Sequence, residues 1–185
     1  MIGLGKSGRA AARLALARGA ASVLAFDHNP TLGLLEKDPV FEVHGGDNGA
    51  SRTILGQFDG ELLNNVDRVV VSPGVPLRKY GLSSLLQSGK QVMSELDFAA
   101  EILPKCIKIL AVTGTNGKST VVTFAGQMLN HLGINTFLGG NLGNPLSEAA
   151  FHCLQNPLLK PKFKVAVVEV SSYQMEIPTS NSALL

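Results

Sequence analysis

Short apolar runs alternate with segments of helical periodicity along the whole chain, and glycine, proline or small polar residues mark most of the changes. Apolar runs of this length are typical of buried strands, and the longer periodic segments between them are typical of helices. The expected strands are residues 22–26, 66–71, 91–93, 107–112 and 163–170, and the expected helices are residues 9–18, 82–88, 95–103, 119–132 and 146–154. This alternation predicts an α/β fold with parallel sheets.

Pro104 and Lys105 interrupt the pattern and divide it into two parts. We expect a Rossmann-like domain over residues 1–104 and the beginning of a phosphate-loop ATPase-type domain over residues 105–185. Only Met1 and Ile2 precede the first glycine loop, so we expect most of the first strand to be missing, although it is central in such a sheet. The content of 45% hydrophobic and 16% charged residues supports a packed core.

A second glycine-rich loop directly follows the expected strand 107–112 and directly precedes a helix. This is the context of a phosphate-binding loop, in which backbone N–H groups surround the phosphates and a lysine reaches the β- and γ-phosphate oxygens. The usual spacing requires a glycine at position 112, where this chain has Val112, so the loop is shorter than the common form. The predicted ATP-binding residues are Gly114, Thr115, Asn116, Gly117, Lys118, Ser119 and Thr120.

A magnesium site is expected beside this loop. Glu169 ends an apolar run, where a buried carboxylate without a partner would be costly and a metal ion would remove the cost. The hydroxyl of Ser119 or Thr120 is the second candidate ligand. We therefore predict that Ser119 and Glu169 bind Mg²⁺ and that Lys118 and Glu169 are the catalytic residues. The helix that follows has Val121, Phe124, Ala125, Met128 and Leu132 on one face.

The first loop, residues 3–8, fits the pattern G-x-G-x-x-G and opens a helix. Its physical basis is a tight turn and a helix N-terminus that faces a phosphate. Asp27 follows about 20 residues later at a strand end, where a carboxylate can accept a hydrogen bond from a ribose hydroxyl. The loop alone favours a dinucleotide site and does not say which nucleotide binds.

Several segments resemble the Mur ligase family. They are residues 113–120 (its nucleotide loop), 139–143 (its GGNIG loop) and 169–176 (its E-x-S-S-[FY]-Q-L-E segment). Residues 3–8, 27, 72–76 and 94–97 resemble the N-terminal domain of the branch that adds D-glutamate.

This resemblance implies an ATP-dependent ligase of peptidoglycan synthesis. ATP phosphorylates the carboxylate of UDP-N-acetylmuramoyl-L-alanine, and the amine of D-glutamate attacks the acyl phosphate. The first loop would then bind the UDP end of this substrate rather than NAD. The implied substrate-binding residues are Lys6, Ser7, Asp27, Gly74, Asn141 and Ser171. Where the family often has Thr-Arg after the aspartate, this chain has His28 and Asn29, and His28 is expected to be a surface loop residue with no functional role.

Charge and composition limit the other functions. The net charge is +2 and the longest basic run is Arg78-Lys79, which argues against nucleic-acid binding. No apolar run approaches the roughly 18 residues of a membrane helix, and Cys106 and Cys153 fit reduced thiols. We expect a cytoplasmic protein, or a plastid protein if the source is photosynthetic, and a monomer rather than an oligomer.

Three alternatives remain: another amino-acid ligase of the same family, a non-catalytic nucleotide-binding fragment, and an NAD-dependent redox protein. In the family, a second metal site and a C-terminal domain follow the segment present here. The chain by itself is therefore expected to release no phosphate above a Lys118→Ala control, while it retains weak Mg-nucleotide binding.

Overall fold

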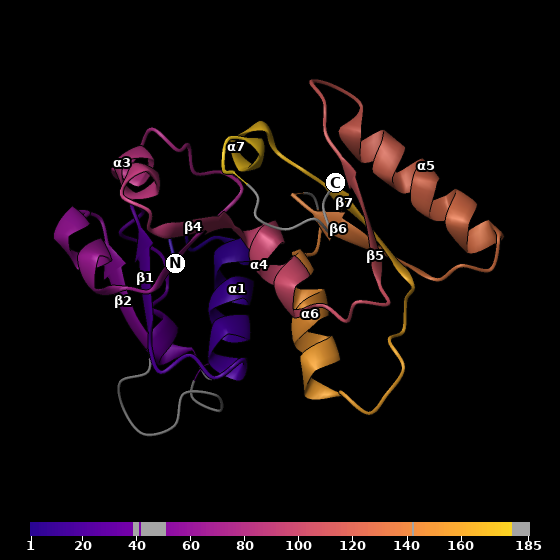
Figure 1. Cartoon of the computed structure of the whole chain (residues 1–185), viewed down its shortest axis with the longest axis horizontal. Helices are drawn as coiled ribbons and strands as arrows, with labels where there is room; N and C mark the ends of the chain where they lie inside the picture. The colour runs from indigo at the N-terminus through magenta and orange to yellow at the C-terminus, as the bar shows by residue number, and fades with distance from the viewer. Residues whose placement is uncertain (39–40, 42–50, 142, 179–185) are drawn as a thin grey trace.

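The computed structural model describes residues 1–38, 41, 51–141 and 143–178. Two parallel sheets lie on either side of a central group of helices (Figure 1). The first sheet contains β1 (Val23–Asp27), β2 (Ser51–Leu55), β3 (Arg68–Val71) and β4 (Gln91–Ser94). Ile2 forms parallel bridges to Phe26 and to Val71, so the first residues of the chain join the β1–β2 pair to the β3–β4 pair. The parallel α/β prediction is confirmed.

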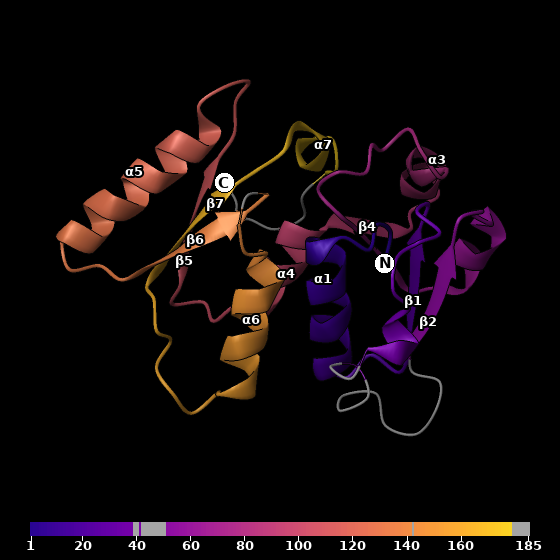
Figure 2. The ribbon, with the colours of Figure 1, turned by 180° about the vertical axis from the view of Figure 1, so that it is seen from behind.

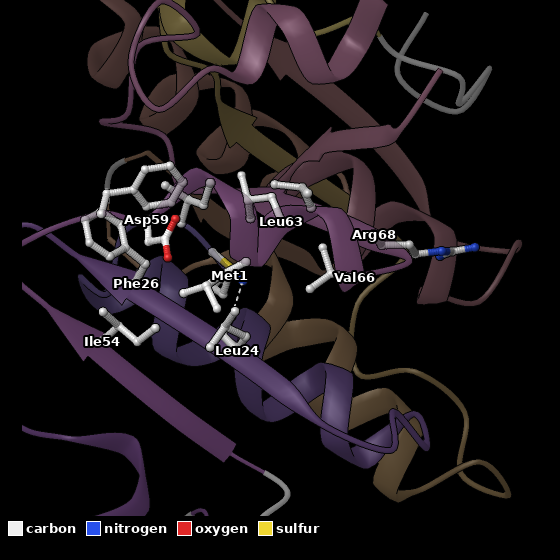
Figure 3. Close-up of a pocket in the computed structure, with 12 residues that line it drawn as sticks. Met1, Leu24, Phe26, Ile54, Asp59, Leu63, Val66 and Arg68 are labelled. Carbon is white, nitrogen blue, oxygen red and sulfur yellow. Dashed lines mark hydrogen bonds between the residues drawn. The ribbon is translucent and has the colours of Figure 1, made fainter. Parts of the chain in front are cut away.

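Met1 and Ile2 occupy the centre of this sheet, where Ile2 forms isolated bridges to both neighbours. Ile2 N donates to Val70 O at 2.9 Å, and the buried amino group of Met1 donates to Leu24 O at 2.6 Å. Beside Met1 lies a cavity of about 20 Å³ whose lining includes Leu24, Ile54 and Val66 (Figure 3). A space of this size holds about one water molecule, so it is no ligand site.

The second sheet has the order β5–β7–β6, with β5 (Lys108–Val112), β6 (Thr136–Gly140) and β7 (Val165–Glu169) all parallel. The register aligns Val112, Glu169 and Gly140. Three carboxyl ends therefore meet at one edge, which is where parallel α/β sheets bind their ligands.

Three helices occupy the space between the sheets: α1 (Lys6–Ala17), α4 (Glu95–Ile102) and α6 (Leu146–Gln155) (Figures 1 and 2). One apolar core includes residues of these helices, of β3 and of β7. α5 (Lys118–His131) lies on the other face of the second sheet. The remaining helical segments are α3 (Leu82–Gln87), α7 (Ser172–Met175), η1 (Leu35–Lys37) and η2 (Gly60–Asn65).

A buried carboxylate lies where α4 meets α6. Glu95 Oε1 accepts a hydrogen bond from Ser147 N at 2.8 Å, in the first turn of α6. Within the described residues Glu95 Oε2 and Ser147 Oγ have no hydrogen-bond partner. Burial raises the pKa of Glu95 to about 6. Where α1 meets α6, Arg13 forms an ion pair with Glu148 and stacks over the Phe151 ring at 4.0 Å.

All ten expected helices and strands are present, with ends that differ by at most three residues. The segment that resembles the family's GGNIG loop, residues 139–143, is not all loop, since Gly139 and Gly140 end β6. The break at Pro104 falls between α4 and β5, but the shared core crosses it, so the two-domain division stays a prediction. In the described part of the chain, no helix has the length and apolar character needed to span a membrane.

The apolar face of α5 that the sequence indicates, with Val121, Phe124, Ala125, Met128 and Leu132, is not the face that packs on the sheet. Phe124 is 60% exposed and Met128 67% exposed, whereas Val122 and Gly126 are buried against the sheet. A Cβ on Gly126 would lie 2.3 Å from a methyl group of Leu138, so α5 can pack this close to β6 only with glycine at this position.

Candidate nucleotide-binding site

The first glycine loop is shaped by close backbone contacts. Gly3 has φ +87°, a conformation that favours glycine. A Cβ on Gly8 would lie 1.8 Å from Gly3 O, so only glycine permits α1 to start so close to the strand. The loop therefore presents the N-terminus of α1, beginning at Lys6, toward the pocket in front of it.

Asp27 holds this loop in place. Its Oδ2 accepts from Leu4 N at 2.6 Å, and its Oδ1 accepts from Asn29 N at 2.9 Å. The side chain is almost buried, and His28 Nδ1 lies 3.4 Å from Oδ1. Each carboxylate oxygen has a second acceptor position, so a ribose contact stays a prediction beside this structural role.

An open pocket of about 360 Å³ lies in front of the loop. It is lined by Gly3, Gly5, Lys6, Ser7, Phe26, Asp27, His28, Ser72, Pro73, Gly74, Val75, Tyr80 and Asn141. Five of the six predicted substrate-binding residues are in this lining, and the sixth, Ser171, is not. Four segments far apart in sequence thus contribute to one cavity. The expected surface residue His28 is exposed and stands at the same pocket.

Ser171 lies next to the pocket lining rather than in it. Its Oγ donates to Pro73 O at 2.9 Å and accepts from Gln174 N at 3.3 Å, as the N-cap of α7. The hydroxyl therefore connects the segment after β7 to the pocket wall. A direct substrate contact by Ser171 remains a prediction.

Tyr80 is a pocket residue that no sequence motif indicated. Among the described residues it is the one non-glycine with positive φ, +59°. Its ring packs against Phe26 (centroids 5.1 Å apart) and Phe58 (4.8 Å). Burial and, secondarily, the charge of Asp27 raise the pKa of the Tyr80 phenol. A strained backbone at a pocket is often functional, and such strain costs about 1–3 kcal/mol.

The second loop connects β5 to α5. Gly114 has φ +145° and Gly117, the N-cap of α5, has φ +76°. Lys118 Nζ donates to Gly114 O at 2.9 Å and to Thr115 O at 3.5 Å, so the lysine folds over its own loop. A phosphate in the loop would offer the ammonium group stronger, charge-assisted bonds in place of these carbonyls.

Glu169 lies directly opposite this loop, at the end of β7. The carboxylate is 5% exposed; its Oε2 accepts from Ser119 Oγ at 2.7 Å and its Oε1 from Asn141 Nδ2 at 3.4 Å. The described residues include no group of three or more His, Cys, Asp or Glu able to hold a metal ion. A hydroxyl and one carboxylate nevertheless fit Mg²⁺, which binds hard oxygen ligands and takes the others from water and phosphate.

Two contacts tie the second sheet to the first pocket. Lys6 Nζ donates to Gly143 O and to Asn144 Oδ1, both at 2.9 Å. Asn141, which lines the pocket, also donates its backbone N–H to Glu169 O at 2.8 Å. The pocket and the Glu169 carboxylate are therefore adjacent, with Asn141 between them. Leu142 lies outside the described residues.

Comparison with known proteins agrees with this arrangement of two loops on parallel sheets. Residues 1–94 match the Mur ligase MurD-like N-terminal domain, and residues 112–183 match the Mur ligase middle domain. The chain therefore belongs to the Mur ligase family.

The chain is similar to two bacterial enzymes named UDP-N-acetylmuramoylalanine–D-glutamate ligase. The one from Desulfosudis oleivorans is 40% identical over 95% of this chain, and the one from Trichlorobacter lovleyi is 36% identical over 95%. The matches cover 35% and 36% of those enzymes, so the chain spans about a third of their length. Among solved structures, a murein peptide ligase from Psychrobacter arcticus is 24% identical, with a TM-score of 0.46 over 93% of this chain and 37% of that one.

Proposed function

We propose that this chain supplies the UDP-substrate pocket and the ATP loop of a ligase that joins D-glutamate to UDP-N-acetylmuramoyl-L-alanine. The observation that carries the proposal is the position of Asn141. It lines the pocket of the first glycine loop and also donates to Glu169, beside the phosphate loop. A substrate bound in the first pocket would thus extend toward the nucleotide held by the second loop.

The chemistry assigned to the site is acyl activation followed by amide formation. The substrate carboxylate attacks the γ-phosphorus of ATP, the bond to the β-phosphate oxygen breaks, and ADP leaves. The amine of D-glutamate then attacks the acyl carbon, phosphate leaves with its bonding electrons, and the nitrogen loses a proton. Both steps concentrate negative charge on phosphoryl oxygens, so catalysis depends on positioning and on nearby positive charge.

Three residues of this chain act on that charge. Lys118 moves from its loop carbonyls onto the phosphate oxygens, and backbone N–H groups at the start of α5 bind the phosphates. Ser119 and Glu169 would hold Mg²⁺, which supplies neutralising charge to the phosphates. The choice of D-glutamate rests on the similarity to the named relatives, as does the expected cytoplasmic location.

The test is calorimetry on this chain with separate ligands. We expect UDP-N-acetylmuramoyl-L-alanine and Mg-ATP each to bind in the absence of the other. Lys6→Ala should weaken binding of the UDP ligand and leave Mg-ATP binding unchanged. Lys118→Ala should weaken Mg-ATP binding and leave binding of the UDP ligand unchanged. NAD should not compete with the UDP ligand. A folded chain that does not bind the UDP ligand, or does not bind Mg-ATP, would overturn the proposal.

A further inference from the structure

The first pocket has distinct chemistry on the two sides of Asp27. On one side, Leu4 N donates to its Oδ2 at 2.6 Å, and the adjoining loop presents the N-terminus of α1 and the Lys6 ammonium group. These groups suit phosphate. On the other side, the chain immediately before Asp27 contributes Phe26, whose ring packs against Tyr80. The carboxylate expected to meet a ribose therefore contacts the loop on the phosphate side, and its charge acts on Tyr80 on the aromatic side.

The Tyr80 ring is half-buried and lines the pocket, so part of it is open to a ligand. Phe26 lies edge-on to it at 72° and Phe58 is tilted at 59°, and these two rings fix its orientation. The backbone at Tyr80 has φ +59°, a left-handed conformation that is uncommon for a bulky residue such as tyrosine. Gly81, the next residue, has φ +68°, so the turn presents Tyr80 from two consecutive left-handed residues.

We propose that Tyr80 recognises the aromatic base of the nucleoside diphosphate by stacking against it. The order phosphate, ribose, base would then follow the order α1 N-terminus, Asp27, Tyr80 through the pocket. Stacking on a tyrosine ring is tolerant of base identity, so it supplies affinity and orientation. This inference rests on the proposed function, because it assumes that a UDP-containing ligand occupies this pocket.

The composition of the chain gives a direct optical test. The chain has two tyrosines and no tryptophan, so its intrinsic fluorescence comes from Tyr80 and Tyr173. Tyr173 lies in α7, outside the pocket lining. In a Tyr173→Phe variant, Tyr80 is the one remaining fluorophore. UDP should quench its emission in a saturable way, after correction with free tyrosine titrated in parallel, while inorganic pyrophosphate, which lacks a base, should not.

Calorimetry with UDP supplies the affinity. Tyr80→Phe keeps the ring and should bind UDP within about twofold of the unmodified chain, whereas Tyr80→Ala should bind about tenfold more weakly. Tyr80→Gly removes the ring and permits the positive φ, so it separates loss of stacking from backbone distortion; it should match Tyr80→Ala. Lys6→Ala should weaken UDP binding but keep full quenching at saturation.

The outcomes separate the two proposals. If UDP binds Tyr80→Gly as tightly as Tyr80→Phe, or saturates the Tyr173→Phe variant without quenching, the role of Tyr80 is refuted and the proposed function stands. If the folded, unmodified chain binds no UDP at all, both proposals fail.

Discussion

Asn141 Nδ2 lies 3.4 Å from Glu169 Oε1, and the backbone N–H of Asn141 donates to the Glu169 carbonyl at 2.8 Å. Two bonds therefore fix Asn141 to the end of β7. The same residue lines the pocket of the first glycine loop. A ligand in that pocket and a metal ion on Glu169 would share one neighbour, so the two sites are coupled through a single side chain.

Asn141→Ala tests whether this side chain contributes to ligand binding in the pocket. The backbone bond to Glu169 remains, so the free energy of unfolding should change by less than about 1 kcal/mol. UDP binding should weaken about fivefold, since one polar contact is lost. Calorimetry gives the affinity and urea unfolding gives the stability. Asn156→Ala, whose side chain contacts only the α6 carbonyl of His152 in the described structure, is the matched control. Unchanged UDP affinity in Asn141→Ala would argue against a role for Asn141 in the pocket.

The features predicted from sequence are those with local causes. The second glycine loop could be located because a strand, two glycines, Lys118 and a helix occur in unbroken succession. The first loop and Asp27 follow a spacing that the turn and the strand length impose. The adjacency of Asn141 and the first loop came only through the family resemblance, because 130 residues or more separate them in sequence.

The features missed depend on tertiary contacts or on weak local signals. Tyr80 reaches the pocket because Phe26 and Phe58, which are distant in sequence, pack against its ring and because its backbone is left-handed, which is unexpected for a tyrosine. β2 contains Ser, Arg and Thr, and β6 ends in two glycines, so neither has the apolar run of a buried strand. The apolar face of α5 was recognised, but whether it is buried depends on which side packs on the sheet.

Two glycines near the end of β6 offer a matched pair of substitutions. Gly140 and Gly143 have φ +97° and +79°, so alanine at either pays a similar backbone cost of about 1–2 kcal/mol. A Cβ on Gly140 would also lie 2.4 Å from Glu169 O, whereas one on Gly143 meets nothing within 4 Å. Gly140→Ala should therefore lose about 2 kcal/mol more than Gly143→Ala in urea unfolding, and it should weaken Mg-ATP binding by displacing Glu169. Equal losses of stability in the two variants would show that β7 can move away from the added Cβ and that the close contact carries no cost.

Glu95 makes stability fall as pH rises. Its carboxyl has a pKa of about 6 in the folded chain and an ordinary value of 4.5, so the folded state binds more protons between these values. The penalty is complete above pH 6 and amounts to about 2 kcal/mol. Glu95→Gln keeps an acceptor for Ser147 N and should raise the free energy of unfolding at pH 8 by up to that amount. Glu101→Gln, also on α4 but partly exposed, is the control and should change stability by less than 1 kcal/mol or so. A destabilised Glu95→Gln chain would contradict this account.

The exposed face of α5 predicts surface behaviour. Phe124→Lys and Met128→Lys replace side chains that are 60% and 67% exposed, so stability should stay within about 0.5 kcal/mol. Binding of a dye that senses apolar surface should decrease in both variants. Val122→Lys, at a position 4% exposed, is the contrast and should destabilise by more than about 3 kcal/mol. If the Phe124 variant were as unstable as the Val122 variant, the face would be part of the core.

The amino group of Met1 should make stability rise with pH above the range in which Glu95 titrates. It is buried, although the residue as a whole is half-buried, and burial lowers its pKa from 8.0 to about 5. The unfolded state therefore binds more protons between these values, so stability decreases as pH falls from 8 toward 5. The decrease between pH 8 and pH 6 should be about 2 kcal/mol in urea unfolding. A chain acetylated at Met1 cannot titrate there and should lose this pH dependence whatever its absolute stability. Glu95→Gln removes the opposing slope below pH 6, so the comparison is made in that background. An unmodified chain with the same pH profile as the acetylated one would show that the amino group stays in water.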